Sequence, residues 1–264
     1  AGAGRDDIRY IATTGFGRYN VPFRDVQITE ITCAAAGAAF LFPASAYVLD
    51  IGFQSTRAIR LREGGRVHGF ATNDKCAAGA GGFVERAARY LEVPLEEMGE
   101  LSLRATEPQS ISSICAVLAE TEIINHLTAG ATVENIVGGI HRSLAARAQG
   151  LIRRIGISVR TKAARAGVGE RAGAGERADA AARDGAPEPE KAGGEDGQVT
   201  FVGGVARQAG MIKALRETLG RPVNVPESPD LVCALGAALL GLSRLARGAA
   251  PTAGAPAGVA AREG

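Results

Sequence analysis

The hydrophobic pattern begins with three short segments that read as β-strands. They cover residues 46–52, 55–62 and 65–72, and each is rich in β-branched and aliphatic residues and bounded by turn signals. Glu63, Gly64 and Gly65 lie between the second and third segments, as expected for a hairpin turn. We therefore expect a meander of strands that leads directly into the stretch around Cys76.

The pattern then changes to helical spacing. From residue 82 to 91 the apolar positions recur every three or four residues, at Phe83, Ala87, Ala88 and Leu91. Further helices are predicted at 113–129, 133–155 and 209–219. The first of these has a stripe that we expect to be buried, formed by Ile114, Leu118, Ile123 and Leu127.

A buried strand and a helix rich in small residues close this pattern. Residues 199–206, "VTFVGGVA", read as a short strand that ends in two glycines, and residues 228–245 form a helix able to pack closely against a neighbour. Strands and helices alternate, so the predicted fold class is α/β.

Two segments lack the composition of a folded core. In residues 161–198, Ala, Gly, Arg and Glu dominate, and Val168 is the single branched aliphatic residue. Such a stretch buries too little apolar surface to offset about 1–2 kcal/mol of backbone entropy per residue. We predict a disordered insertion at 161–198, a disordered tail at 248–264, and one ordered domain formed by 1–160 and 199–247.

Composition and charge exclude several classes of function. Hydrophobic residues make up 46% of the 264 residues and aromatics 5%, so the core depends on Ala, Val, Leu and Ile. The net charge is only +2, which argues against a nucleic-acid-binding surface. No apolar run reaches the roughly 18 residues that span a membrane. We expect a cytoplasmic protein.

Two glycine-containing strand ends are candidate phosphate sites. The chain has no G-x-x-x-x-G-K-[ST] motif, which excludes a P-loop NTPase. Asp50 and Gly52, with Gln54 in the following turn, could hold Mg²⁺ through water and admit phosphate to the backbone. Gly203 and Gly204 follow the later strand. Each signal alone is equally typical of an ordinary turn.

Four cysteines are too few for a disulfide framework in a chain of this size. Cys33 and Cys233 lie in apolar, alanine-rich runs and are interpreted as core residues. Cys76 stands before a glycine-rich helix start, where free N–H groups and the helix dipole favour a thiolate. The three histidines show no metal-ligand spacing and are interpreted as structural: His68, His126 and His141.

The order of several motifs resembles one family. "VLDIG", "NDKCAAGAGGF", "SSICAVLAETEII", "GIHRSLAAR", "FVGGVARQ" and "CALGAALLG" occur in this order. They resemble the iron–sulfur activase ATPases of 2-hydroxyacyl-CoA dehydratases and of benzoyl-CoA reductase, within the actin, sugar kinase and heat-shock ATPase superfamily. The resemblance covers residues 8–160 and 199–245. It implies an actin-like, ribonuclease H-like fold with mixed sheets flanked by helices.

The resemblance also implies a metal centre. In the family a [4Fe–4S] cluster is shared between two subunits, and the matching thiolates here are Cys76 and Cys115. Two thiolates per chain require a partner to complete the site, so the implied assembly is a homodimer or a pseudo-symmetric heterodimer with a related subunit. The alternative is that both are small buried side chains.

The implied nucleotide site takes ATP and Mg²⁺. Asp50 and Gln54 are the implied catalytic residues. The residues implied to contact the nucleotide are Asp50, Gly52, Gln54, Gly79, Gly81, Gly203, Gly204 and Gln208. Gly79, Gly81 and Gly82 would approach both the terminal phosphates and the cluster, so hydrolysis would move the cluster. Glu120 and Glu122 either support this site or lie on a solvated face.

Three functions follow from the resemblance. The leading one is the ATPase and electron-transfer subunit of a benzoyl-CoA reductase type enzyme in anaerobic aromatic degradation, with ferredoxin as donor and a large CoA-thioester reductase as partner. The near alternative is the activator of a 2-hydroxyacyl-CoA dehydratase. The third, of another class, is an actin-like small-molecule kinase or a nucleotide-sensing module without a cluster.

This sequence departs from the family pattern in four places. Phe53 replaces a glycine, Ser55 an aspartate and Ala80 a threonine of the family motifs. The first phosphate hairpin of the superfamily, "GIDxGS", is missing, so the sequence is expected to be incomplete at its N-terminus.

Overall fold

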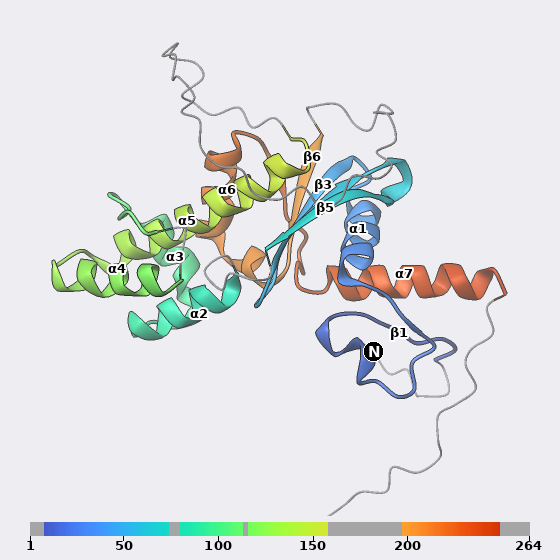
Figure 1. Ribbon diagram of the computed structural model, residues 1–264. Helices are drawn as coiled ribbons and strands as arrows, with labels where there is room; N and C mark the ends of the chain where they lie inside the picture. The colour runs from blue at the N-terminus through green and yellow to red at the C-terminus, as the bar shows by residue number, and fades with distance from the viewer. Residues whose placement is uncertain (1–7, 74–79, 113–115, 158–196, 249–264) are drawn as a thin grey trace, which may run out of the picture.

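A mixed five-stranded sheet lies at the centre of the molecule (Figure 1). The structure is a computed structural model and describes residues 8–73, 80–112, 116–157 and 197–248. The strand order is β5-β4-β3-β6-β7, in which β3 pairs antiparallel with β4 and parallel with β6. The strands are β3 Ser45–Ile51, β4 Thr56–Leu61, β5 Val67–Asn73, β6 Gln198–Val202 and β7 Val223–Asn224.

Strand β3 is apolar on both faces because it is the central strand of the sheet. Tyr47, Leu49 and Ile51 belong to the larger core, together with residues of the helices that follow the meander. Val48 points to the opposite face and joins a smaller core. This alternation is the period of two expected of a strand, with both faces covered.

The larger core is covered by five helices that lie on one side of the sheet in Figure 1. The long helix α5 contacts β4 and β5, and Thr132 caps it by accepting a hydrogen bond from the backbone N–H of Asn135. The five helices are α2 Gly81–Tyr90, α3 Met98–Leu103, α4 Ala116–Thr128, α5 Val133–Arg154 and α6 Ala209–Leu219.

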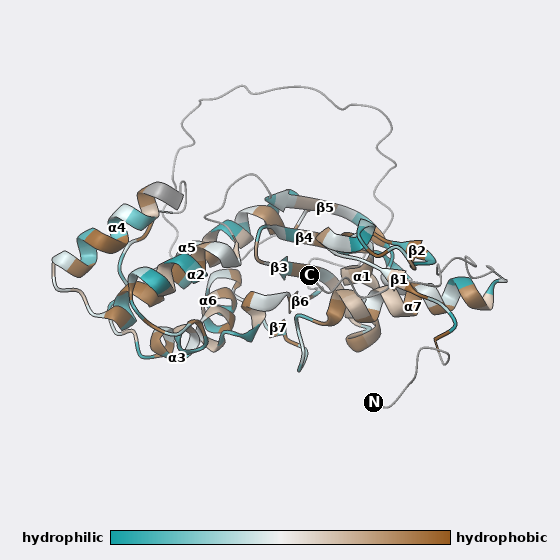
Figure 2. Ribbon diagram, turned by 90° about the horizontal axis from the view of Figure 1, so that it is seen from below, coloured by the Kyte–Doolittle hydropathy of each residue, from teal (hydrophilic) through white to brown (hydrophobic). Residues whose placement is uncertain are grey.

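The opposite face is covered by α1 (Glu30–Leu41), and α7 (Val232–Ala246) packs across α1, with Val232 in the smaller core. Both helices are rich in small residues. Both are drawn largely in pale to brown colours in Figure 2. Their backbones meet because glycines stand at the crossing: a Cβ on Gly236 would lie 1.8 Å from the carbonyl oxygen of Cys33. This close approach confirms the prediction that the last helix packs tightly against a neighbour.

Smaller elements complete the chain. Strands β1 (Ala12–Thr13) and β2 (Val26–Gln27) form a separate parallel pair, which α7 contacts through β1. The short 3₁₀ turns are η2 Phe16–Tyr19, η3 Glu63–Gly65, η5 Leu95–Glu97 and η7 Gly204–Arg207. No helix in the described ranges is long and apolar enough to cross a membrane.

The strands and most helices confirm the predicted α/β order, with four differences. Leu118 is 54% exposed rather than buried, although Ile123 on the same helix is fully buried. Strand β6 begins at Gln198, inside the predicted insertion; residues 158–196 lie outside the described part of the chain. The helix predicted from 228 begins at Val232, because Ser228 to Leu231 form a turn. Helices α1 and α3 were not predicted.

We predict that Gly236→Ala lowers the free energy of unfolding by about 3 kcal/mol, because the new methyl group must push α7 away from α1. Gly150→Ala is the matched control: Gly150 lies inside α5 with open space around it, so alanine should raise stability by about 0.5–1 kcal/mol. Urea denaturation measures both. Equal effects of the two substitutions would contradict the close crossing.

Candidate nucleotide site

Two glycine-containing loops meet at one edge of the sheet. Strands β3 and β6 are parallel neighbours, with Asp50 opposite Val202, so their carboxyl ends lie side by side. The turn at Gly52 and Phe53 follows β3, and Gly203 and Gly204 follow β6. This edge is the usual ligand position in an open α/β sheet. The fold thus brings together two motifs that lie about 150 residues apart in the sequence.

Gly203 makes the contact between the two loops possible. Its φ of 91° favours glycine, and its N–H donates to the carbonyl of Pro229 at 2.9 Å. A Cβ there would lie 2.4 Å from the carbonyl oxygen of Ile51 and 2.6 Å from Oδ1 of Asp50. The adjoining Gly204 has open space instead. Gly203 therefore fixes the loop, and Gly204 is free to face a ligand.

A pocket of about 170 Å³ lies beside these loops. Four of the nucleotide residues proposed from the sequence line it together, from three separate segments of the chain: Gly52, Gly81, Gly204 and Gln208. The remaining walls are Phe53, Val84, Glu85, Leu95 and Val205. Gly79 lies outside the described residues.

The first turn of α2 is hydrogen-bonded to the turn after β3. The N–H of Gly81 donates to the carbonyl of Gly52 at 2.9 Å, and the N–H of Gly82 donates to the carbonyl of Phe53 at 2.8 Å. The expectation that these helix-terminal N–H groups are free to face a ligand is therefore wrong for Gly81 and Gly82. Instead they attach α2 directly to the loop that lines the pocket.

Asp50 is buried and paired. Only 4% of it is exposed, and its Oδ2 accepts from Nη1 of Arg57 at 2.9 Å. Arg57 also lies 3.4 Å from Glu30, which in turn lies 3.4 Å from Arg18. Burial raises the pKa of Asp50, and the charge of Arg57 opposes this shift. Asp50 is not among the residues that line the pocket, although its Oδ1 faces Gly203.

Gln54 stands in the exposed turn between β3 and β4. The structure gives its side chain no hydrogen bond to another described residue. It also lies outside the set of pocket-lining residues. The turn therefore reaches the pocket through Gly52 and Phe53 and not through Gln54.

Gln208 is held from outside the pocket by His141. The Nε2 atom of His141 lies 2.7 Å from Oε1 of Gln208, and Nε2 of Gln208 lies 3.5 Å from the carbonyl oxygen of Leu95. His141 is fully buried, which lowers its pKa to about 4, and its Nδ1 has no hydrogen-bond partner among the described residues. The sequence interpretation treated His141 as structural. Its place on the apolar face of α5, beside Val137 and Leu144, was the available signal.

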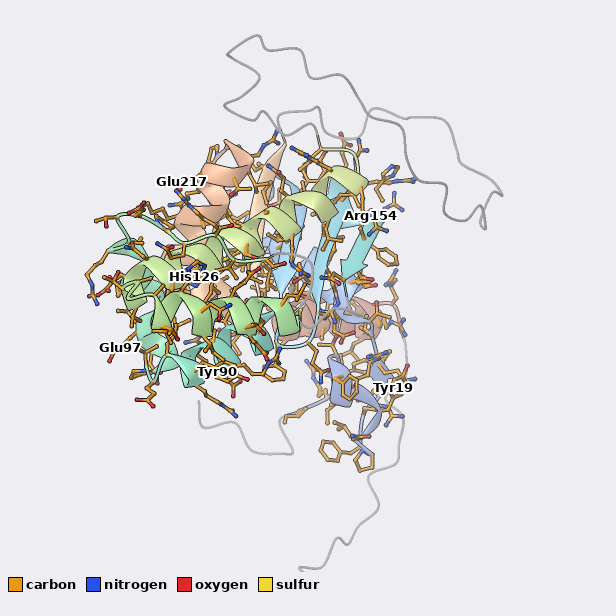
Figure 3. The ribbon with its side chains drawn as sticks, turned by 60° about the vertical axis from the view of Figure 1, so that its left-hand side comes forward. Tyr19, Tyr90, Glu97, His126, Arg154 and Glu217 are labelled. Carbon is orange, nitrogen blue, oxygen red and sulfur yellow. The ribbon has the colours of Figure 1, made fainter. Side chains whose placement is uncertain are left out.

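Cys76 and Cys115 both lie outside the described residues, so their positions stay a prediction. The helices that follow them are described and are in contact. Arg86 of α2 donates to Glu120 of α4 at 2.7 Å, and the hydroxyl of Tyr90 lies 3.3 Å from the same carboxylate (Figure 3, Tyr90 labelled). Glu122 accepts from the backbone N–H of Ser112. Neither glutamate lines the pocket; Glu120 instead joins α2 to α4.

Cys33 and Cys233 pack in the interior, as predicted. Cys33 is fully buried in α1, and Cys233 is partly buried in α7 with its Sγ 3.9 Å from the carbonyl oxygen of Glu30. Burial raises the pKa of both thiols, that of Cys233 to about 12. Among the described residues there is no group of three His, Cys, Asp or Glu side chains arranged to hold a metal ion.

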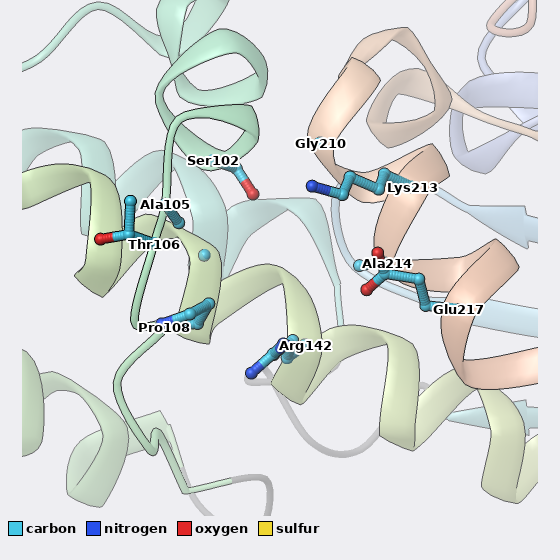
Figure 4. A pocket seen from close by; sticks show the side chains of 10 residues that line it. Ser102, Ala105, Thr106, Pro108, Arg142, Gly210, Lys213, Ala214 and Glu217 are labelled. Atoms are coloured by element: carbon cyan, nitrogen blue, oxygen red, sulfur yellow. The ribbon is translucent and has the colours of Figure 1, made fainter. Parts of the chain in front are cut away.

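A second pocket of about 100 Å³ lies between α3, α5 and α6 (Figure 4). It shares no lining residue with the first pocket. Its rim carries the charged side chains of Arg142, Lys213 and Glu217, and glycines bring the helices together beneath it. A Cβ on Gly210 would lie 2.4 Å from Cβ of Ser102. The sequence does not predict this pocket, because its residues come from three separate helices and the loop after α3.

Comparison with protein families gives one match over most of the chain. The model of the BadF/BadG/BcrA/BcrD ATPase family matches residues 1–167. The chain belongs to this family. Relatives include an activator of lactoyl-CoA dehydratase from Anaerotignum propionicum, 39% identical over 90% of this chain and 78% of the relative. A benzoyl-CoA reductase subunit from Thauera aromatica is 36% identical over 92% of this chain and 75% of its own length.

Solved structures of family members share the fold. The activator of 2-hydroxyisocaproyl-CoA dehydratase from Clostridium difficile, with bound ADPNP, has a TM-score of 0.76 and 35% identity, covering 94% of this chain and 78% of that chain. Component A of the Acidaminococcus fermentans (R)-2-hydroxyglutaryl-CoA dehydratase has a TM-score of 0.75 and 34% identity, covering 92% of this chain and 79% of that chain. The chain therefore has the fold of these two activators, a mixed sheet flanked by helices.

We predict that His141 makes the protein sensitive to acid. Its pKa is about 4 when folded, against about 6.5 when unfolded, so the unfolded chain binds the extra proton first as the pH falls. Protonation of His141 therefore leaves the free energy of unfolding unchanged above pH 6.5 and lowers it by about 3 kcal/mol by pH 4. Urea denaturation measures the free energy of unfolding across this range. Between pH 6.5 and pH 4 it should fall by about 3 kcal/mol more in the wild type than in His141→Phe. Identical pH slopes would contradict it.

Proposed function

We propose that this protein is an ATP-dependent activase that delivers electrons to a CoA-thioester enzyme. The observation that carries the proposal is the meeting of Gly52, Gly81, Gly204 and Gln208 at one pocket, in a member of an ATPase family. Gly52 and the turn from Gly204 to Gln208 follow the carboxyl ends of the parallel strands β3 and β6, and Gly81 begins the helix bonded to the turn after β3. ATP is the proposed ligand, and the relative with bound ADPNP supports this choice.

The proposed roles within the pocket follow from what each group offers. The backbone around Gly52 and Gly204 has room for phosphate and nucleoside to approach closely. Gln54, whose side chain has no hydrogen bond to another described residue, orients water at the terminal phosphate. Asp50, which is paired with Arg57 and does not line the pocket, assists Mg²⁺ through water, and the phosphates supply the direct ligands.

Cys76 and Cys115 are the proposed thiolate ligands of a [4Fe–4S] cluster shared with a second subunit. The described part of the chain fits this assignment, since the two cysteines precede α2 and α4, and these helices are in contact. Such a cluster supplies one low-potential electron at a time. Two thiolates per chain call for a homodimer or a heterodimer with a related subunit.

A continuous set of contacts leads from the pocket to the helices that follow the two cysteines. The carbonyls of Gly52 and Phe53 hold the first turn of α2, and Arg86 further along α2 holds Glu120 of α4. A change in the turn when the terminal phosphate is lost therefore acts on both helices at once. We propose that this path couples hydrolysis to electron transfer.

The proposed client is a 2-hydroxyacyl-CoA dehydratase, with ferredoxin as the electron donor. Dehydratase activators are among the relatives in both the sequence and the structure comparisons, at 34–39% identity. The second candidate is the benzoyl-CoA reductase client favoured from the sequence motifs, and the relative from that enzyme, at 36% identity, supports it. Retention of one or the other large component on the immobilised protein distinguishes the two clients.

We predict that the protein purified without oxygen is a brown dimer with about four iron atoms per dimer. Cys76→Ser and Cys115→Ser should each remove most of the iron, because each removes two of the four thiolates of the dimer. Cys233→Ala is the control and should keep it, since Cys233 packs inside between α1 and α7. Iron analysis and size-exclusion chromatography measure the result. A colourless monomer that phosphorylates a small molecule would favour the kinase alternative.

We predict that Arg86→Met leaves ATP binding intact but weakens the coupling between ATP and iron accessibility by about fivefold, because the ion pair between α2 and α4 is lost and only the weaker Tyr90 contact with Glu120 stays. The measurement is the rate at which a chelator extracts iron, with and without ATP. Arg104→Met is the control: Arg104 pairs with Glu134 of α5, and neither residue lines the pocket, so its loss should not change the ratio. If the two variants behave alike, the Arg86 contact does not carry the coupling.

A further inference from the structure

Gln208 stands at the N-cap position of α6, but its side chain does not cap this helix. Its amide instead bridges two other elements, with Oε1 at His141 of α5 and Nε2 at the carbonyl oxygen of Leu95 in η5. The backbone of Gln208 is also confined, since a Cβ on Gly99 would lie 3.2 Å from its Cα. The position and the direction of this amide are therefore set by the fold before any ligand arrives.

The contacts determine which side-chain atom of Gln208 is the amide oxygen and which is the amide nitrogen. A carbonyl oxygen only accepts hydrogen bonds, so the NH₂ group must face Leu95 and Oε1 must face His141. His141 then carries its proton on Nε2. Its Nδ1, which has no hydrogen-bond partner among the described residues, is the unprotonated nitrogen. The reverse assignment would place two acceptor oxygens together and leave a buried N–H without a partner, which is the rarer and costlier arrangement.

We propose that His141 is a positioning residue that makes Gln208 a hydrogen-bond donor toward the nucleoside bound in the pocket. One N–H of the Gln208 amide points to Leu95, and the second is left for a ligand. The ligand group that fits there is an acceptor, such as a ribose oxygen or an unprotonated ring nitrogen. His141 itself touches no ligand, because it is fully buried behind Gln208. This inference rests on the proposed nucleotide site.

The low pKa of His141 supports this arrangement, because the imidazole stays neutral at physiological pH. A neutral ring has one N–H, and it is committed to Gln208. The amide therefore keeps one orientation over the physiological range.

The first experiment measures ADPNP binding by titration calorimetry. His141→Phe keeps the bulk but removes the donor, and we expect about tenfold weaker binding, as for the loss of one buried hydrogen bond. His141→Gln restores an N–H and should recover most of the affinity. Adding His141→Phe to Gln208→Leu should cause no further loss, since His141 acts only through Gln208. His68→Phe, an exposed histidine bonded to Arg62, is the control and should bind like the wild type.

The second experiment reads the tautomer of His141 in the wild-type chain by ¹⁵N NMR of labelled histidine, and so does not depend on a variant that folds. The expected result is the Nε2–H form. The Nδ1–H form would overturn the inference, as would unchanged ADPNP affinity in His141→Phe. A wild-type chain that binds no ADPNP would overturn the proposed function instead, and the tautomer would still report whether His141 orients Gln208.

Discussion

The arrangement of the site depends on two backbone hydrogen bonds, from the N–H groups of Gly81 and Gly82 to the carbonyls of Gly52 and Phe53. A helix start normally leaves its first N–H groups for side chains, water or ligands. Here two of them are used to join α2 to the turn after β3. The glycines permit this, because a Cβ on Gly81 would lie 3.1 Å from the carbonyl oxygen of Gly52 and one on Gly82 3.1 Å from that of Phe53. The pocket and the helix after Cys76 are thereby parts of one hydrogen-bonded unit.

Close backbone approach recurs on both sides of the sheet. Gly203 brings the loop after β6 against the end of β3, and Gly236 brings α7 against α1. A core with few aromatic side chains gains its packing density in this way, since small residues let whole helices and loops come into contact. The consequence is rigidity around the pocket: a loop fixed by backbone contacts has little freedom, so a change in one loop is transmitted to the elements bonded to it.

Buried polar groups lie behind the pocket on both faces of the sheet. Asp50 is neutralised by Arg57, and the neutral ring of His141 holds the amide of Gln208. Burial acts on the two groups in the same sense, because it disfavours the charged form of each: it raises the pKa of Asp50 and lowers that of His141. Neither group lines the pocket itself, and His141 acts on the pocket through Gln208.

The sequence by itself determined the local elements and the chemistry available at their ends. Periodicity placed β3, β4, β5, α2, α5 and α6 to within two residues, because these segments have strong apolar patterns, and the glycine motifs identified the loops that line the pocket. Helix α1 was not predicted because its alanine-rich run has almost no difference between an apolar and a polar face. Leu118 was expected to be buried, but only one side of α4 is covered, and Leu118 lies on the exposed side. The tertiary structure alone decided that the N–H groups of Gly81 and Gly82 are occupied, that Glu120 joins two helices, and that His141 orients Gln208. Each of these is a contact between segments far apart in the chain, and a pattern read along one segment carries no information about its partner across the fold.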